Sequence, residues 1–210
     1  MSKTYSVKEI YYTLQGEGFH SGRPAVFCRF SGCNLWSGRE EDRETAICQF
    51  CDTDFWGTDG VNGGKYTAAE LTDKIYEVWP EAKEAFIVFT GGEPALQLDE
   101  ELIQVLKSHH SEIAIETNGT LELPSGIDWI CMSPKANTEL IVQSGQELKI
   151  VYPQEGIDPL NYIEWDFEHL YIQPMDSPKQ AENTAAAIEF CKNNPRFKLS
   201  LQTHKYLQIP

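Results

Sequence analysis

Three cysteines in one stretch of the chain could together hold a metal or a metal cluster. Cys33, Cys48 and Cys51 follow the spacing C-x14-C-x2-C, and many of the residues in the long gap are charged. Two thiolates two residues apart are typical of metal binding, and a third nearby is typical of a cluster site. No fourth ligand lies nearby in the sequence. Three protein ligands leave one coordination position open, which usually indicates chemistry rather than structure.

A second group of residues with chemical potential follows short apolar runs. These runs pass directly into polar, glycine or proline residues at Thr90–Pro94, Glu116–Gly119, Ser133–Lys135, Gln173–Asp176 and Gln202–His204. In a parallel α/β fold the carboxyl ends of all strands open on one face, where ligands bind. Any one of these ends could be an ordinary loop, but together they predict one large pocket.

The residue types at these ends indicate what the pocket binds. Gly91 and Gly92 lack a Cβ atom, so a ligand can approach their backbone closely. Glu93 and Glu116 could bind an ammonium group or ribose hydroxyls, and Lys135 could bind a carboxylate. This set suits an amino acid joined to a nucleoside. The alternatives are an ordinary Gly-Gly turn and a solvated surface lysine.

Short, nearly continuous apolar runs must position these ends, and they are typical of strands covered on both faces. They occupy Ala25–Phe30, Phe86–Phe89, Glu112–Ile115, Trp129–Met132, Leu148–Tyr152, Leu170–Ile172 and Lys198–Leu201. Helical patterns begin at Thr67, where Glu70 completes a capping box, at Asp99 and at Thr184. We therefore expect an α/β fold, an incomplete (β/α) barrel of about six parallel strands and about three helices, since a complete barrel needs about 250 residues. With no linker-like stretch, residues 1–210 should form a single domain.

Composition narrows the class of protein. The chain has 210 residues, a net charge of −15 and six cysteines. An acidic surface repels phosphate backbones, which argues against a nucleic-acid partner and otherwise aids solubility. No apolar run of about 18 residues and no secretory signal is present, so we expect no membrane span and a cytoplasmic protein with reduced thiols. Cys28, Cys131 and Cys191 lie in apolar stretches and should be buried.

These motifs together resemble the radical S-adenosylmethionine enzymes, and more closely the 7-carboxy-7-deazaguanine synthase (QueE) family of the queuosine pathway. The resemblance covers nearly the whole chain and is carried by YYTLQGEGFHSGRPAVFCRFSGCNLW, CDT, TGGEP, ETNG, SPK and YIQPMD. The usual cysteine spacing of such enzymes is C-x3-C-x2-C. Here Ser37 stands at the second position, and the insertion GREEDRETAI makes a modified cluster-binding loop that delays this cysteine to Cys48. We expect the insertion to be a solvated excursion or, alternatively, a docking surface for an electron donor.

The resemblance implies three cofactors, namely a [4Fe–4S] cluster, S-adenosylmethionine at its fourth iron, and Mg²⁺. It implies that 6-carboxy-5,6,7,8-tetrahydropterin is converted to 7-carboxy-7-deazaguanine by hydrogen abstraction, ring contraction and loss of ammonia, with no side chain as catalytic group. Cys33, Cys48 and Cys51 would hold the cluster and Thr53 the Mg²⁺, although a turn hydroxyl would explain Thr53 alone. A homodimer and an electron donor such as a flavodoxin or ferredoxin are also implied.

Binding residues follow from the same resemblance. S-adenosylmethionine would contact Phe50, Cys51, Asp52, Gly92, Glu116, Ser133, Pro134, Lys135, Gln173, Pro174, Met175 and Asp176. The pterin would contact Leu14, Gln15, Gly16, Glu17, Arg29, Thr90, His204 and Pro210. Arg29 is expected to bind the substrate carboxylate in bidentate fashion, with a buried, charge-paired arginine as the alternative. The terminal carboxylate of Pro210 is expected to close over the substrate.

Two other functions stay open at this point. A structural zinc module would use the same cysteines and a histidine, but such sites are four-coordinate and closed, and the strand-end motifs would be unexplained. A radical S-adenosylmethionine activase, which makes a glycyl radical on a partner protein, would share the cluster motifs but not LQGEG, Arg29 or Thr53. His20, His109 and His110 are expected to be solvated, and His169 has no assigned role.

Overall fold

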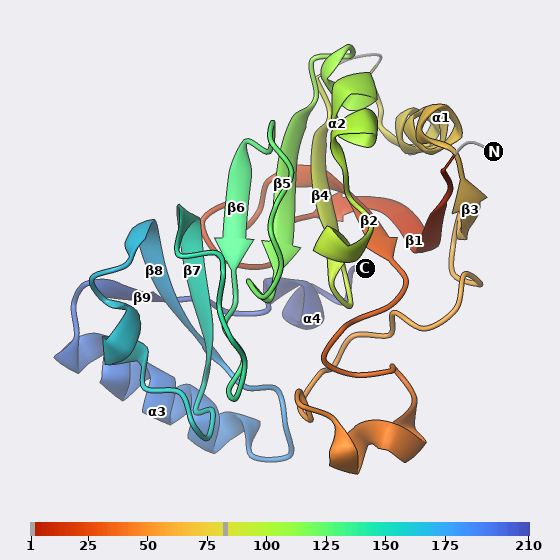
Figure 1. Cartoon of the computed structure of the whole chain (residues 1–210). Helices are drawn as coiled ribbons and strands as arrows, with labels where there is room; N and C mark the ends of the chain where they lie inside the picture. Colours follow the sequence, from red (N-terminus) through yellow and green to blue (C-terminus); the bar gives the residue numbers. More distant parts are fainter. Residues whose placement is uncertain (1–2, 82–83) are drawn as a thin grey trace.

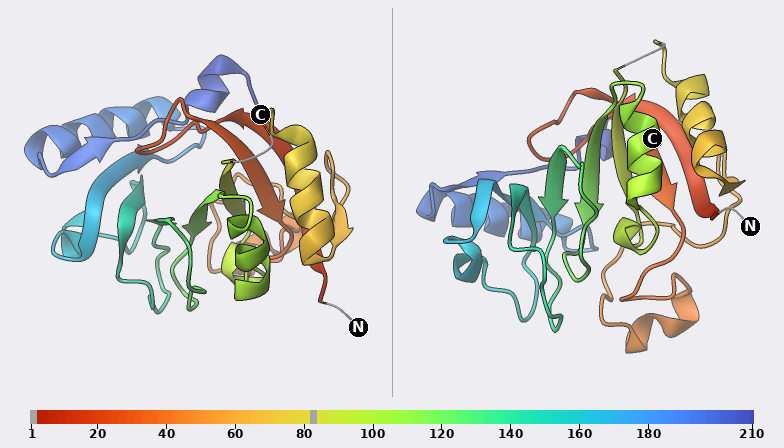
Figure 2. Two further views of the ribbon diagram at one scale, coloured as in Figure 1. Left: turned by 90° about the horizontal axis from the view of Figure 1, so that it is seen from above. Right: turned by 45° about the horizontal axis from the view of Figure 1, so that its top comes forward.

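One twisted sheet forms the framework of the protein and curves into an open barrel (Figures 1 and 2). This computed structural model describes residues 3–81 and 84–210. Within those ranges the strand order is β3-β1-β2-β4-β5-β6-β7-β8-β9, with β3 and β9 at the two edges. Because the edge strands are not neighbours in this order, the barrel does not close. The predicted incomplete barrel is confirmed. The single domain over 1–210 stays a prediction, and residues 1–2 and 82–83 lie outside the described residues.

Parallel strands make up most of the sheet. In the described part of the chain they are β2 (Pro24–Phe30), β4 (Phe86–Gly91), β5 (Glu112–Thr117), β6 (Trp129–Met132), β7 (Ser144–Tyr152), β8 (Asp166–Pro174) and β9 (Phe197–Leu199). Each corresponds to one of the apolar runs in the sequence. Two further strands, β1 (Tyr5–Leu14) and β3 (Gly64–Tyr66), extend the sheet in antiparallel pairing. Polar residues interrupt β1 and β3 is very short, so neither forms a continuous apolar run.

The helices lie mainly outside the curved sheet (Figure 2). Among the described residues the α-helices are α1 (Ala68–Val78), α2 (Glu100–Lys107), α3 (Gln180–Asn193) and α4 (Thr203–Leu207). Short 3-10 helices are η1 (Glu40–Thr45), η2 (Pro94–Leu96) and η3 (Pro159–Tyr162). The first three α-helices correspond to the expected ones, and α4 is additional. No helix in the described ranges has the length and apolar character needed to cross a bilayer.

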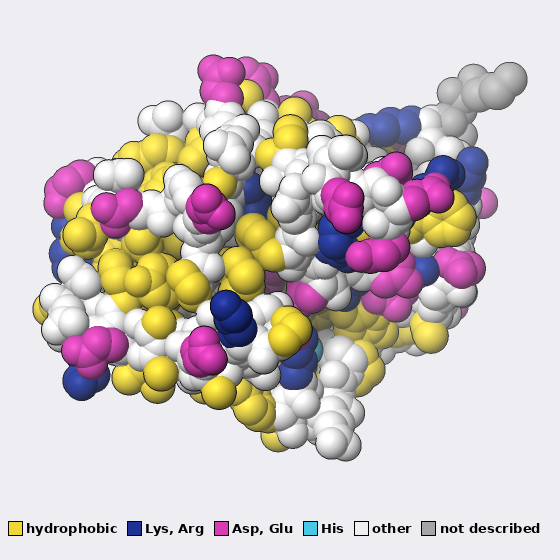
Figure 3. All heavy atoms as spheres, turned by 90° about the horizontal axis from the view of Figure 1, so that it is seen from below, with side chains coloured by type: hydrophobic (Ala, Val, Ile, Leu, Met, Phe, Trp, Pro, Cys, Tyr) yellow, Lys and Arg dark blue, Asp and Glu magenta, His cyan; other side chains and the backbone are white. Residues whose placement is uncertain are grey.

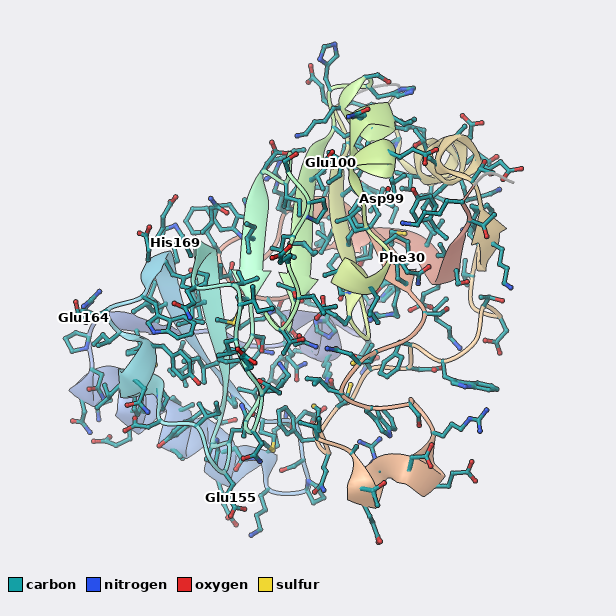
Figure 4. All side chains as sticks on the ribbon, in the orientation of Figure 1. Phe30, Asp99, Glu100, Glu155, Glu164 and His169 are labelled. Atoms are coloured by element: carbon teal, nitrogen blue, oxygen red, sulfur yellow. The ribbon has the colours of Figure 1, made fainter. Side chains whose placement is uncertain are left out.

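Helix starts follow local capping chemistry. Thr67 Oγ1 accepts from the Glu70 backbone N–H, and the Glu70 side chain accepts from the Thr67 N–H, so the predicted capping box is confirmed. The Asp99 side chain caps α2, at whose start Asp99 and Glu100 lie in Figure 4. The predicted start at Thr184 is wrong, because α3 begins at Gln180 with a polar first turn that shows no apolar periodicity. The Thr184 hydroxyl instead donates to the Gln180 carbonyl.

Alternation along the strands separates an apolar outer face from a mixed inner face. On β2, Val26, Cys28 and Phe30 belong to the core that also contains side chains of α1 and α2. A second outer core joins β7 and β8 to α3. On the inner face Phe27 lies in an apolar layer with side chains of β4 and β5, and Arg29 follows it toward the carboxyl end. The period of two residues therefore turns polar side chains toward the barrel interior at the strand ends.

Candidate active site

A cavity of about 360 Å³ opens at the carboxyl ends of the parallel strands. Its wall includes residues from all of the strand ends that the sequence singled out, together with the loop that carries the cysteines. Figure 3 views the molecule from below, the side to which β4, β5 and β6 point in Figure 1. It shows apolar side chains gathered on one half of this face and charged side chains of both signs on the other. The predicted large pocket is therefore present.

Nearly all the predicted site residues line this one cavity. From the ligand sets they are Leu14, Gln15, Gly16, Glu17, Arg29, Cys33, Cys48, Phe50, Cys51, Asp52, Thr53, Thr90, Gly92, Glu116, Ser133, Lys135, Gln173, Pro174, Met175, Asp176, His204 and Pro210. Pro134 does not line it. That proline is buried between its two lining neighbours, and its carbonyl accepts a hydrogen bond from Gln154 Nε2 at 3.3 Å.

The three cysteines lie on the wall of this cavity as unpaired thiols. Burial raises the pKa of each thiol, and the positive charge of Lys135 acts in the opposite direction on Cys48 and Cys51. Within residues 3–81 and 84–210, no group of three or more His, Cys, Asp or Glu side chains is arranged to hold a single metal ion. A [4Fe–4S] cluster requires less convergence, because each thiolate binds a different iron. Three thiols facing one cavity therefore fit a cluster as donor set.

The turn after β4 brings backbone close to the first cysteine. A Cβ atom on Gly92 would lie 2.3 Å from the Gly32 carbonyl oxygen and 2.6 Å from Cys33 Cβ, so the turn requires glycine there. Glu93 is fully buried, and its carboxylate accepts from Thr117 Oγ1 at 2.8 Å and from the Asn118 N–H at 2.7 Å. The expectation that Glu93 faces an ammonium or ribose is thus wrong. Its carboxylate ties the TGGEP turn to the ETNG turn.

A buried lysine, Lys149, for which the sequence predicted no role, lies in the floor of the cavity. Lys149 Nζ lies 2.5 Å from Glu17 Oε2 and 3.3 Å from Glu116 Oε2, and its side chain is 5% exposed. Burial by itself would raise the pKa of Glu17, but the charge and hydrogen bond of Lys149 outweigh it and lower the pKa to about 2. Gln15 Nε2 donates to Glu116 Oε1 at 3.0 Å. The sequence signal is a lysine inside the apolar run LKIVY, since a charge in a buried strand needs partners.

Arg29 lies on the inner face of β2 and is charge-paired, which is one of the two roles that the sequence left open. Its Nε donates to Glu9 Oε1 at 2.8 Å and its Nη2 to the Tyr11 hydroxyl at 2.9 Å. The same guanidinium lines the cavity and carries further N–H donors. Arg29 is thus charge-paired and also lines the cavity, and its contact with a substrate carboxylate stays a prediction.

The C-terminal segment lies beside β1 (Figure 2) and contributes His204, Lys205 and Pro210 to the cavity wall. The Gly16 carbonyl accepts from the Thr203 N–H at 2.9 Å and from Thr203 Oγ1 at 2.8 Å. A Cβ on Gly16 would lie 2.2 Å from His204 Nδ1, so glycine is needed for this contact. The Pro210 carbonyl accepts from Thr13 Oγ1 at 3.1 Å. The tail therefore holds His204 and Pro210 at the predicted site.

Two side chains of this segment connect the predicted substrate and cofactor residues. Gln202 Nε2 donates to Glu17 Oε1 at 3.0 Å and to Asp52 Oδ2 at 3.2 Å. Lys205 Nζ lies 2.6 Å from Asp52 Oδ2 and 2.5 Å from Asp176 Oδ2. Gln202 was recognised only as part of a strand end, and no pattern in the tail KYLQIP indicated Lys205.

The histidines away from the tail lie outside this cavity. The His20 ring is 4.2 Å from that of Trp129, and its Nε2 is buried with no hydrogen-bond partner in the described structure. The expectation of a solvated His20 is therefore wrong. Phe19 stacks on His169 at 4.4 Å, and Figure 4 shows His169 at the opposite end of the sheet from Glu155. Of the three apolar-stretch cysteines, Cys28 and Cys131 are buried and Cys191 is half-buried.

An open (β/α) barrel with three thiols on a loop at its carboxyl edge is typical of the radical S-adenosylmethionine enzymes. A scan against protein-family models gave no match. Among curated proteins, the chain is 59% identical to the 7-carboxy-7-deazaguanine synthase of Burkholderia multivorans, covering 99% of this chain and 100% of the relative. It is 55% identical to that of Caulobacter vibrioides, with the same coverage. The fold is similar to the crystal structure of QueE from Escherichia coli, with 27% identity, a TM-score of 0.71 and coverage of 96% of this chain and 95% of that one. The chain belongs to the 7-carboxy-7-deazaguanine synthase family.

Proposed function

We propose that this protein is the radical S-adenosylmethionine enzyme that converts 6-carboxy-5,6,7,8-tetrahydropterin to 7-carboxy-7-deazaguanine in the queuosine pathway. The observation that carries the proposal is the convergence of the three thiols, the TGGEP turn and the LQGEG segment on one cavity. Membership of the family at 55–59% identity supports the same substrate. A structural zinc site would not require the large cavity beside the thiols.

Cys33, Cys48 and Cys51 would hold the [4Fe–4S] cluster, with S-adenosylmethionine at the remaining iron. When bound, these groups supply an electron and the hydrogen-abstracting radical. The residues of the chain position them. Gly92 lets the backbone approach the ligand, and Lys135 would bind the carboxylate of the methionyl group. Lys135 Nζ donates a hydrogen bond to the Ser133 carbonyl at 2.7 Å, and this bond holds the lysine side chain on the cavity wall.

The other predicted cofactor contacts surround this position. They are Phe50, Asp52, Glu116, Ser133, Pro134 and Gln173–Asp176. These residues lie on three separate strand ends and on the cluster loop. This placement supports their assignment as cofactor contacts, because the strand ends and the loop together would enclose a nucleoside. Pro134 is the weakest member, because only its two neighbours line the cavity.

The substrate would lie between the floor and the tail. Gln15 and Glu17 would bind the aminopyrimidine edge, since a fixed carboxylate accepts from amino and ring N–H groups. Arg29 would bind the substrate carboxylate, beside Thr90 on the neighbouring strand. Leu14, Gly16, His204 and Pro210 would form the remaining wall. Because Glu17 and Glu116 are already held by Lys149, they are preorganised to accept hydrogen bonds.

Thr53 would contribute one ligand to Mg²⁺, with substrate oxygens and water completing the coordination. A magnesium ion needs few protein ligands, so one hydroxyl beside the cluster loop is sufficient. An ion in this position would orient the substrate relative to the hydrogen-abstracting group. It would also neutralise part of the negative charge of the substrate carboxylate.

An anaerobic turnover assay tests the whole proposal. Protein reconstituted with iron and sulfide receives 6-carboxy-5,6,7,8-tetrahydropterin, S-adenosylmethionine, Mg²⁺ and a chemical reductant, and the products are separated by chromatography with mass detection. We expect 7-carboxy-7-deazaguanine and ammonia in equal amounts, with less product when Mg²⁺ is omitted. A brown, cluster-loaded protein that forms no deazaguanine would refute the substrate assignment, and a colourless zinc-loaded protein would refute the class.

Three further properties belong to the proposal by resemblance to the family. The electron donor would be a flavodoxin or ferredoxin, the active form a homodimer, and the location the cytoplasm. Replacement of the chemical reductant by a reduced flavodoxin tests the first, and sedimentation equilibrium tests the second. We also propose that the chain folds as a single domain, which predicts one cooperative unfolding transition for the apo protein.

A further inference from the structure

The insertion between Cys33 and Cys48 is folded onto the cluster loop. The Trp36 indole N–H donates to the Arg39 carbonyl at 3.0 Å, and the Ile47 N–H donates to the Leu35 carbonyl at 3.1 Å. Trp36 is 8% exposed and packs edge-on against Phe55 at 5.4 Å. The expectation that the insertion is exposed to solvent therefore holds only for the acidic outer side of η1. The inner side of the insertion packs against the cluster loop.

Arg43 lies on this inner side and contacts both ends of the loop. Its guanidinium carbon is 4.1 Å from the centroid of the Trp36 ring. Its Nη1 donates to the Gln49 carbonyl at 2.9 Å and to the Cys51 carbonyl at 3.1 Å. Trp36 follows the first cysteine closely, whereas Gln49 and Cys51 belong to the C-x2-C segment. One side chain thus joins the two parts of the cysteine motif that the insertion separates.

The chemistry of arginine suits this connection. A planar guanidinium can lie on an aromatic face and donate in its own plane to two carbonyls, which an ammonium group cannot do at once. The ion pair of Arg43 with the exposed Glu40 adds little, because surface pairs contribute about 0–1 kcal/mol. The ring and carbonyl contacts are therefore the ones that fix the loop.

We propose that Arg43 is a positioning residue for the cluster, holding the Cys48–Cys51 segment at the right distance from Cys33. A three-residue gap sets this distance by covalent connection, whereas a flexible gap of fourteen residues leaves the two parts free to separate. The positive charge of Arg43 beside the Cys51 carbonyl would also favour the reduced state of a bound cluster. The inference rests on the cluster site of the proposed function.

The test compares three variants of the full-length protein, reconstituted anaerobically with iron and sulfide. Arg43→Gln removes both the positive charge and the planar guanidinium group, whereas Arg43→Lys keeps only the charge. Arg39→Gln is the matched control. Arg39 lies in the same insertion, but its side chain is 55% exposed and its guanidinium carbon is 5.5 Å from the centroid of the Trp56 ring. The readouts are iron retained against a chelator, the electron paramagnetic resonance spectrum of the reduced cluster, and its midpoint potential.

We expect Arg43→Gln to weaken cluster retention by roughly 10- to 100-fold, the usual effect of removing an outer partner of metal ligands. Its spectrum should change and its midpoint potential should shift to more negative values, because a nearby positive charge is lost. Arg43→Lys should keep a potential near that of the wild type but still lose iron faster. Arg39→Gln should match the wild type in all three readouts.

Unchanged retention and an unchanged potential in Arg43→Gln would overturn the proposal. Circular dichroism of the apo proteins shows whether each variant is folded. If Arg43→Gln does not fold, Trp36→Leu decides, since loss of the ring under Arg43 should shift retention and potential in the same direction, and wild-type values would refute the role. A wild-type protein that binds no cluster would instead refute the proposed function itself.

Discussion

The floor and the rim of the cavity are built by different means. In the floor, Lys149 projects from β7 and Glu116 from β5, on either side of β6, and with Glu17 they satisfy one another's charges. In the rim, the thiols are carried by a loop and make only weak contacts. Cys33 Sγ accepts from the Leu35 N–H at 3.4 Å, and Cys51 Sγ lies 3.9 Å from the Thr53 carbonyl oxygen.

This difference separates stability from function. Charges fixed on strands are preorganised before a ligand arrives, and breaking a buried pair destabilises the fold. Thiols on a loop add little to the apo fold, but they provide the donors that a cluster needs. Substitutions in the rim should therefore abolish function while the apo chain keeps its stability, and substitutions in the floor should reduce both.

The largest expected effect is on cluster binding. In Cys51→Ser the cluster loses one of three ligands, so iron retention and turnover should fall to background, while the free energy of unfolding of the apo protein changes by less than about 1 kcal/mol. Iron analysis, the turnover assay and urea denaturation measure these quantities. Cys191→Ser, half-buried against the outer core, is the control and should keep its iron. A fully loaded Cys51→Ser protein would remove this cysteine from the ligand set.

Loss of the floor lysine should have the largest effect on stability. Lys149→Met leaves the partly buried carboxylates of Glu17 and Glu116 without their buried cation, which costs about 3–5 kcal/mol of unfolding free energy. Urea denaturation of the apo protein measures the loss, and Lys198→Met, at an exposed position of β9, should change it by less than about 0.5 kcal/mol. Addition of Glu17→Gln to Lys149→Met should recover part of the stability. If Lys149→Met is as stable as wild type, the floor is not held by this pair.

The sequence was most informative where the chemistry is tied to strand ends. Continuous apolar runs located the parallel strands, and parallel strands bring their carboxyl ends to one edge whatever the loops do. That is why residues as distant as Cys33 and Asp176 could be assigned to one cavity. The capping box at Thr67 and the cap at Asp99 were equally readable, because they depend on residues only three positions apart.

Side-chain partners across the fold could not be read in the same way. Glu93 looked like a ligand group because its carboxylate lies at a strand end, yet its partners Thr117 and Asn118 come from the next strand end. Lys149 was hidden in an apolar run, because one sequence does not show which carboxylates a buried lysine will meet. The insertion looked solvated because its acidic residues dominate the composition, whereas one arginine and one tryptophan determine its fold.

Acid should destabilise the floor of the cavity, where Glu17 pairs with Lys149, before it affects the cysteine loop at the rim. A carboxyl whose pKa falls from 4.5 to about 2 on folding contributes about 3 kcal/mol of stability near neutral pH. The contribution is complete above the unfolded-state pKa of 4.5 and is lost as the pH falls from there toward 2. Unfolding free energies of wild type and Glu17→Gln should therefore converge over this window. For Glu168→Gln, at an exposed position of β8, the unfolding free energy should follow the same pH dependence as that of the wild type. A difference in unfolding free energy between wild type and Glu17→Gln that does not change with pH would refute the lowered pKa of Glu17.

The smallest effect should come from the outer layer, which contacts neither floor nor rim. Thr67→Ala removes the cap of α1 and should cost about 1 kcal/mol of unfolding free energy, whereas Thr67→Ser keeps the hydroxyl and most of that stability. Both variants should retain iron and turnover like the wild type, because α1 packs on the outer face of β1 and β2. Thermal denaturation and iron analysis of the same samples measure both quantities. Loss of iron in Thr67→Ala would mean that the outer layer, and not only the loop, sets the geometry of the rim.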